Sequence, residues 1–173
     1  METARLRLVP VTVEIVECTL AEELDKVSRL IGALLPDPWP GRALIERAFS
    51  ASLDAIRADP TSRLWGDRIA IGRTGDPPRV IGSVIFHGQP DADGMVEVGY
   101  GMELKSQGLG YATEATGAQV DWALSQQGVR KVRATTPPWH RASIRVLEKI
   151  GFRPAGTDDH EALGEVLVFE RLR

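Results

Sequence analysis

A glycine-rich turn joins a strand-like run to a helix-like run in the second half of the chain. The strand-like run covers residues 95–104 and the helix-like run covers residues 111–127. Between them, residues 107–112 read Gln-Gly-Leu-Gly-Tyr-Ala. A turn of this kind at a helix start leaves several backbone N–H groups without partners, and the helix dipole adds partial positive charge beside them. Because phosphate groups bind at such helix starts, the sequence predicts a phosphorylated ligand.

The bulk composition is that of one globular domain spanning residues 1–173. Apolar residues make up 43% of the chain and charged residues 26%, which allows a sizeable buried core. The net charge of −3 disfavours a nucleic-acid partner. Cys18 is the only cysteine, so an intrachain disulfide and a cysteine zinc cluster are both excluded. No set of His, Asp and Glu residues has the spacing of metal ligands, so no metal is expected.

Residues 1–16 lack the pattern of a secretory signal. Their apolar side chains alternate with Arg5, Arg7, Thr12 and Glu14. No apolar run in the chain approaches the roughly 18 residues of a membrane span. We therefore expect a cytoplasmic protein with no membrane partner.

Hydrophobic periodicity predicts the order of the elements, since alternation indicates strands and a spacing of three or four residues indicates helices. We expect a strand over 5–16, helices over 21–34 (capped by Thr19) and 43–58 (ending near Pro60), strands over 63–71, 80–87 and 95–104, a helix over 111–127, a strand over 129–136, a helix over 141–150, and two strands within 153–172 separated by residues 158–161. This order predicts an α+β (mixed α/β) domain, in which a central mixed sheet of about seven strands is flanked by about four helices. The unit over 95–136 is expected to connect two parallel strands by a right-handed crossover.

Three glycine-rich templates compete for the turn. A nucleotide-triphosphate loop needs a lysine after its last glycine, and none follows Gly110. A dinucleotide fingerprint needs a third glycine where Thr113 stands, and here it would follow an antiparallel-looking hairpin; NADPH binding would test that alternative. The third template, Q/R-x-x-G-x-G/A, is satisfied by Gln107, Gly110 and Ala112.

The third template gains weight from its neighbours in the sequence. Upstream, residues 96–100 read Val-Glu-Val-Gly-Tyr, and downstream, residues 142–152 read Ala-Ser-Ile-Arg-Val-Leu-Glu-Lys-Ile-Gly-Phe. Together these motifs resemble the GNAT superfamily of acetyl-CoA-dependent N-acetyltransferases, and within it the branch of ribosomal-protein N-terminal acetyltransferases and their relatives. The resemblance is specific over residues 80–152, looser over the final hairpin and weak before residue 63.

The resemblance implies that acetyl-CoA is the co-substrate and that the diphosphate of coenzyme A lies on the glycine-rich turn. In the family, the strand before the turn diverges from its parallel neighbour, and the pantetheine arm enters between them. The cofactor-binding residues implied for this chain are Met102, Gln107, Gly108, Leu109, Gly110, Tyr111, Ala112, Thr113, His140 and Ser143.

Transfer of an acetyl group to an amine needs a base, because a lysine amine has a pKa of about 10.4 and an α-amine about 8. Glu97 is the candidate base, directly or through water; alternatively, it faces solvent or pairs with an arginine of a neighbouring strand. Ser143 is the candidate proton donor or sulfur contact, by resemblance to a family motif Asn-x-x-Ser at the start of this helix. His140 stands in place of that asparagine, so it either donates one hydrogen bond to the pantetheine arm or acts as an acid or base itself.

The expected acceptor is a primary amine, on a small molecule or at a peptide or protein N-terminus. A non-catalytic module of the same fold that binds or senses acyl-CoA stays open as an alternative, since the family asparagine is replaced. Trp39, Trp65 and Trp139 are candidates for the walls of the acceptor cleft, whereas His87 and Trp122 are expected to be structural. The strand-rich C-terminal edge of the sheet is where a homodimer would form.

Overall fold

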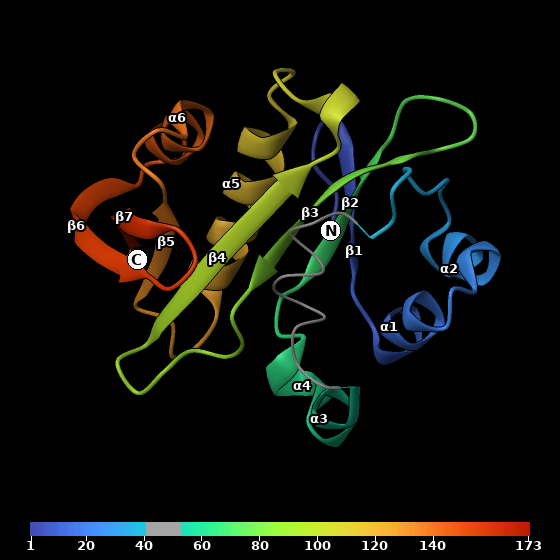
Figure 1. The fold of residues 1–173 in the computed structure, drawn as a ribbon, viewed down its shortest axis with the longest axis horizontal. Helices are drawn as coiled ribbons and strands as arrows, with labels where there is room; N and C mark the ends of the chain where they lie inside the picture. The colour runs from blue at the N-terminus through green and yellow to red at the C-terminus, as the bar shows by residue number, and fades with distance from the viewer. Residues whose placement is uncertain (41–52) are drawn as a thin grey trace.

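A computed structural model describes residues 1–40 and 53–173 of the protein. These residues form seven strands and six α-helices, arranged as Figure 1 shows. In chain order the elements are β1 (Leu6–Pro10), α1 (Val13–Leu20), α2 (Leu24–Ile31), α3 (Leu53–Ala58), α4 (Pro60–Arg63), β2 (Arg68–Gly72), β3 (Val80–Phe86), β4 (Met95–Met102), the 3-10 turn η2 (Leu104–Ser106), α5 (Tyr111–Ser125), β5 (Lys131–Thr136), α6 (Arg141–Lys149), β6 (Arg153–His160) and β7 (Gly164–Leu172).

The seven strands form one sheet in the order β1-β2-β3-β4-β5-β7-β6. Neighbouring strands are antiparallel except β4 and β5, which run parallel and are connected through α5. In the view of Figure 1, α5 passes behind β4. The predicted mixed sheet and the parallel connection over 95–136 are therefore confirmed. Two helices, α1 and α4, were not predicted.

The parallel strands β4 and β5 pair over only a short stretch. Their paired positions are Met95 with Lys131, Val96 with Val132, and Glu97 with Arg133. Beyond Glu97 in β4 and Arg133 in β5, the two strands do not pair with each other in the described structure, although β4 continues to Met102 and β5 to Thr136. The carboxyl ends of β4 and β5 therefore diverge, and this divergence positions the site described below.

Two apolar cores cover opposite faces of the sheet. Ala70 in β2 belongs to the core around α5, whereas its neighbours Ile69 and Ile71 belong to the core under α1 and α2. Because successive side chains of a strand point to opposite faces, this alternation puts the two cores on the two sides of the sheet. Trp122 of α5 packs against the first core, as predicted.

The structure corrects the prediction for the N-terminal region. The strand expected over 5–16 ends at Pro10, and the helix α1 follows it. Thr12 caps this helix, because its Oγ1 accepts a hydrogen bond from the Ile15 N–H at 3.3 Å. Thr19 is not a cap but a buried residue inside α1, where its hydroxyl donates to the Ile15 carbonyl at 2.7 Å.

The region around Pro60 also differs from the prediction. The helix expected over 43–58 falls partly outside the described residues, which show only α3 from Leu53. Pro60 does not stop a helix but begins α4, and Asp59 caps α4 by accepting a hydrogen bond from the Ser62 N–H at 3.0 Å. The strand expected over 63–71 consequently begins later, at Arg68.

The C-terminal hairpin carries the outer edge of the sheet. Its turn lies at residues 161–163 rather than 158–161, because β6 continues through His160. All residues of β6 are exposed, and a register shift between Pro154 and Gly156 interrupts its pairing with β7. Proline, irregular pairing and charged side chains are features by which natural edges limit pairing with other chains.

Candidate active site

The glycine-rich turn presents a row of free backbone donors. Gly108 has φ 74° and Gly110, the N-cap of α5, has φ 82°, a region in which glycine carries no steric penalty. Within the described residues, the N–H groups of residues 108–113 have no protein acceptor. No atom lies within 4 Å of the place where a Cβ of Gly108 would be. The turn therefore has the free backbone donors that an anion site needs, and binding of a phosphate there stays a prediction.

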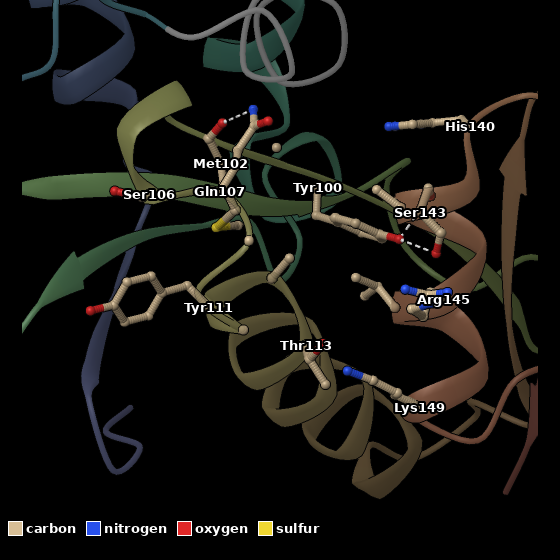
Figure 2. Close-up of a pocket in the computed structure, with 16 residues that line it drawn as sticks. Tyr100, Met102, Ser106, Gln107, Tyr111, Thr113, His140, Ser143, Arg145 and Lys149 are labelled. Atoms are coloured by element: carbon tan, nitrogen blue, oxygen red, sulfur yellow. Dashed lines mark hydrogen bonds between the residues drawn. The ribbon is translucent and has the colours of Figure 1, made fainter.

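A cavity of about 450 Å³ opens beside the turn, between the end of β4, the start of α5 and one side of α6 (Figure 2). Every residue predicted to bind the cofactor lines this cavity except Leu109, whose side chain is exposed. The lining residues are Tyr100, Gly101, Met102, Ser106, Gln107, Gly108, Gly110, Tyr111, Ala112, Thr113, His140, Ala142, Ser143, Arg145, Val146 and Lys149.

The end of β4 is tied to the turn by a side chain. The Nε2 of Gln107 donates a hydrogen bond to the Met102 carbonyl at 3.0 Å, which Figure 2 marks with a dashed line. A carbonyl oxygen has two lone pairs, so Met102 retains acceptor capacity toward a ligand. The Tyr111 ring packs at the margin of the core and also lies under the Arg5 guanidinium, 4.4 Å from it.

Arg145 and Lys149 of α6 add two cationic side chains to the cavity wall. Neither was predicted, although a signal for them exists in the sequence. Both follow Ala142 at spacings that return to the same face of a helix, and Ser143 had already been assigned to that helix. The cavity thus combines backbone donors on one wall with two cations on the other.

Two hydroxyl groups meet in the wall of the cavity. The hydroxyls of Tyr100 and Ser143 are 2.9 Å apart, and the Tyr100 hydroxyl also lies 3.2 Å from the Ser143 carbonyl, to which it can donate (Figure 2). Ser143 is 9% exposed. Tyr100 was not predicted as a site residue, although the alternation of residues 96–100 puts it on the face of β4 opposite Glu97.

A second cavity, of about 160 Å³, lies where β4 and β5 diverge. It shares Tyr100, His140 and Ser143 with the larger cavity, so these residues separate the two. Its other walls include residues of β4, the end of β5, α6 and the C-terminal hairpin: Val98, Gly99, Thr135, Thr136, Leu147, His160, Leu163 and Val166. The site therefore has two compartments that meet at His140 and Ser143.

Glu97 lies next to the second cavity rather than in it. Its Oε1 accepts a hydrogen bond from the Thr135 hydroxyl at 3.0 Å, and Thr135 lines the cavity. Its Oε2 is 4.0 Å from Nδ1 of His87, and the Glu97 side chain is 22% exposed. The carboxylate is thus connected to the cavity through one hydroxyl group.

The three candidate tryptophans have different surroundings. Trp65 packs against Phe86 and Trp122, with ring centroids 5.1 and 5.0 Å apart, and is part of the core. Trp39 packs on the other core and donates from Nε1 to the Thr19 hydroxyl at 3.3 Å. Only Trp139, 73% exposed, is next to a residue that lines both cavities, His140.

Two kinds of feature are absent from residues 1–40 and 53–173. No helix there is long and apolar enough to cross a membrane. No group of three His, Cys, Asp or Glu side chains there is arranged to hold a metal ion.

Comparison with known proteins identifies the family. A family model described as an acetyltransferase (GNAT) domain matches residues 5–153. The protein therefore belongs to the GNAT acetyltransferase family. Its relatives include YjdG, an uncharacterized N-acetyltransferase of Bacillus subtilis (strain 168), which is 26% identical over 152 residues and 88% of each chain.

Solved structures share the fold at low sequence identity. RimL, a ribosomal L7/L12 alpha-N-protein acetyltransferase solved in complex with coenzyme A, superposes with a TM-score of 0.61 at 15% identity, over 98% of this chain and 95% of that chain. The spermidine N-acetyltransferase SpeG from Vibrio cholerae has a TM-score of 0.64 at 14% identity, over 98% of this chain and 95% of that chain. The overall fold is thus shared with acetyltransferases that are named for different acceptors.

Proposed function

We propose that the protein is an acetyl-CoA-dependent N-acetyltransferase that transfers the acetyl group directly to a primary amine. The observation that carries this proposal is the row of free N–H groups over residues 108–113, beside a cavity whose wall holds the Tyr100–Ser143 hydroxyl pair. A helix start with free amides suits the diphosphate of coenzyme A. Arg145 and Lys149 provide cations that suit its phosphate charges.

Acetyl-CoA supplies a thioester whose carbonyl carbon forms a bond to the amine nitrogen while the carbon–sulfur bond breaks. The Ser143 hydroxyl is the proposed proton donor to the departing sulfur, since it is buried in the wall of the cavity. Tyr100, 2.9 Å from it, replaces that proton, and the second proton that the nitrogen loses as the amide forms returns to Tyr100, directly or through water. In this scheme His140 donates a hydrogen bond to the pantetheine arm from the boundary between the two cavities.

The smaller cavity is the proposed entrance for the amine. The ammonium group must lose a proton before it attacks, and Glu97 is the proposed acceptor of that proton. The Thr135 hydroxyl connects the two, since it lines the cavity and donates to Glu97 at 3.0 Å. RimL is an acetyltransferase of a protein α-amine and SpeG of spermidine, and both acceptors carry primary amines, which supports this acceptor class without choosing between a peptide and a small molecule.

Calorimetric titration with coenzyme A tests the proposed cofactor site. Gly110→Asp introduces a negative charge and a strained φ at the centre of the turn, so we expect it to weaken binding by more than about 10-fold. Gly128→Asp is the matched control. Gly128 also has a positive φ, 87°, has open space around its Cβ position, and does not line the cavity. The control is expected to bind coenzyme A like the wild type.

Release of free thiol from acetyl-CoA, measured with peptide N-termini, polyamines and other small amines, tests the proposed reaction. Turnover with at least one primary amine is the expected result. Binding of coenzyme A without turnover on any amine would instead support a non-catalytic acyl-CoA-binding module. Equal affinities of Gly110→Asp and Gly128→Asp would contradict the cofactor site itself.

A further inference from the structure

The N-terminal segment holds the glycine-rich turn through residues that do not line the cavity. Arg5, just before β1, donates from Nη1 to the Leu109 carbonyl at 2.9 Å and from Nε to Oε2 of Glu114 at 2.7 Å. Its guanidinium also covers the Tyr111 ring at 4.4 Å. One side chain therefore contacts the middle of the turn, the first residue of α5 and the first turn of that helix.

The carboxylate of Glu114 is bound by this N-terminal segment. Its Oε1 accepts hydrogen bonds from the Thr3 hydroxyl at 2.6 Å and from the Arg5 N–H at 2.8 Å, while its Oε2 accepts from the Arg5 side chain. Burial opposes ionisation of this carboxyl, but the hydrogen bonds from Thr3 and Arg5 outweigh burial and lower its pKa. Glu114 is thus a fixed negative charge in the first turn of α5.

A negative charge at this position has two opposing effects. An acidic residue in the first turn stabilises a helix, because it complements the positive end of the helix dipole. The same charge cancels the partial positive charge that attracts a phosphate, unless a cation neutralises it. Arg5 is that cation, and it also fixes the Leu109 carbonyl, which lies between the two glycines of the turn.

We propose that Arg5 and Glu114 form a clamp that positions the diphosphate-binding turn and neutralises its only first-turn acid. This inference rests on the proposed use of acetyl-CoA. Arg5, Glu114 and Thr3 do not line the cavity, so we assign their effect to the position and charge of the turn. Arg5 is therefore a positioning residue, which no motif of the turn indicates.

Charge variants separate this role from a purely structural one. Arg5→Ala releases Leu109 and leaves the Glu114 carboxylate unpaired beside the turn, so its affinity for coenzyme A should fall by about 10-fold or more. Glu114→Gln removes the negative charge, so it should bind coenzyme A at least as tightly as the wild type, even though its melting temperature falls. The double variant should recover at least about half of the lost binding free energy, because the unpaired carboxylate is gone.

Two further variants serve as controls. Arg73 donates to the Thr3 carbonyl at 2.7 Å and pairs with Glu2, so it holds the same segment without contacting the turn. Arg73→Ala is expected to lower the melting temperature while leaving the affinity for coenzyme A within about two-fold of the wild type. Arg5→Lys keeps the positive charge and should retain most of the affinity for coenzyme A. If Arg5→Ala does not fold, Arg5→Lys is compared with the wild type in its place.

An acetyl donor without phosphate groups tests whether the loss in Arg5→Ala arises at the diphosphate-binding turn. S-acetylpantetheine carries no phosphate, so Arg5→Ala and the wild type should use it with the same kcat/KM, whereas their KM values for acetyl-CoA should differ. Equal deficits with both donors, or affinities that simply follow melting temperature across the variants, would overturn the clamp. Failure of the wild-type protein to bind coenzyme A would overturn the proposed function and the clamp with it.

Discussion

At the scale of single residues, the Tyr100–Ser143 pair is the most specific chemical feature of the site. The two hydroxyls lie 2.9 Å apart at the boundary between the two cavities, so either one can donate to the other. Groups that pass one proton in sequence act as a unit, and the loss of either disables the path. This gives a clear expectation for their variants.

Ser143→Ala and Tyr100→Phe should each lower kcat by about 10²-fold, the usual contribution of a general acid, while KM for acetyl-CoA changes little. The double variant should be about as slow as either single variant. Ser106→Ala is the control, since Ser106 lines the same cavity but its hydroxyl donates to Glu103 at 3.1 Å. Steady-state kinetics measure all four proteins, and multiplicative losses in the double variant would contradict a shared proton path.

Asp67, just before β2, is a buried carboxyl group with an incomplete set of partners. Its Oδ1 accepts a hydrogen bond from the Phe86 N–H at 2.7 Å, whereas in the described part of the chain its Oδ2 has none. Burial raises the pKa of Asp67 to about 7, and the hydrogen bond from Phe86 only partly offsets this. The folded protein thus retains a proton that the unfolded chain releases at a much lower pH.

The protein should therefore lose stability as the pH rises from about 4 to about 7, because the unfolded state ionises first in that window. The full loss from this group is on the order of 4 kcal/mol above pH 7. Asp67→Asn lacks this titration, so its free energy of unfolding relative to the wild type should increase through the same window. Urea unfolding across the window measures the difference, and parallel profiles would show that Asp67 is not the titrating group.

At the scale of elements, the end of β4 depends on a glycine in the adjacent strand. Gly82 of β3 is opposite Met102, and a Cβ at this position would collide with the Gly101 carbonyl oxygen and lie 2.7 Å from the Met102 sulfur. Glycine here is thus a requirement of close strand approach rather than of a positive φ. It keeps Met102 at the wall of the larger cavity.

Gly82→Ala should destabilise the protein by about 1–3 kcal/mol, as overpacking usually does. It should also weaken coenzyme A binding, because the end of β4 must shift. Gly72→Ala in β2 is the matched control, since the nearest atoms to its Cβ position are 3.8 Å away. Urea unfolding and calorimetry check both variants; equal effects at the two glycines would show that the contact with β4 is unimportant.

The sequence predicted elements well where local signals are strong. Between β3 and α6, glycines, strand alternation and the helix stop at Gly151 all act within a few residues, and the elements there match the prediction within a few positions. Before β2, Thr12 and its neighbours fit alternation and a capped helix equally well, and tertiary burial of Ile15 and Cys18 selects the helix. The turn was predicted in detail, but Tyr100, Arg145 and Lys149 belong to the site only through the contact of α6 with β4 and α5.

At the scale of the whole molecule, the site exists because two parts of one sheet diverge. Strands β1 to β4 and strands β5, β7 and β6 are joined by a short parallel pairing, and the cavities lie beyond it. No local pattern encodes such a contact, or the clamp between Arg5 and Glu114, because the partners are far apart in the chain. A homodimer at the free edge stays a prediction, and the exposed, interrupted strand β6 argues against edge-to-edge pairing there.

The clamp also affects the order in which parts of the protein can fold during translation. Arg5 is translated 109 residues before Glu114, so at typical rates the segment around Arg5 waits roughly 5 to 20 seconds for this partner to be synthesised. Until then Arg5 lacks the Glu114 carboxylate, and the sheet that β1 joins is incomplete. The segment around Arg5 is thus fixed only after α5 has been translated, and a nascent chain that stalls before α5 emerges lacks the partner that holds this segment.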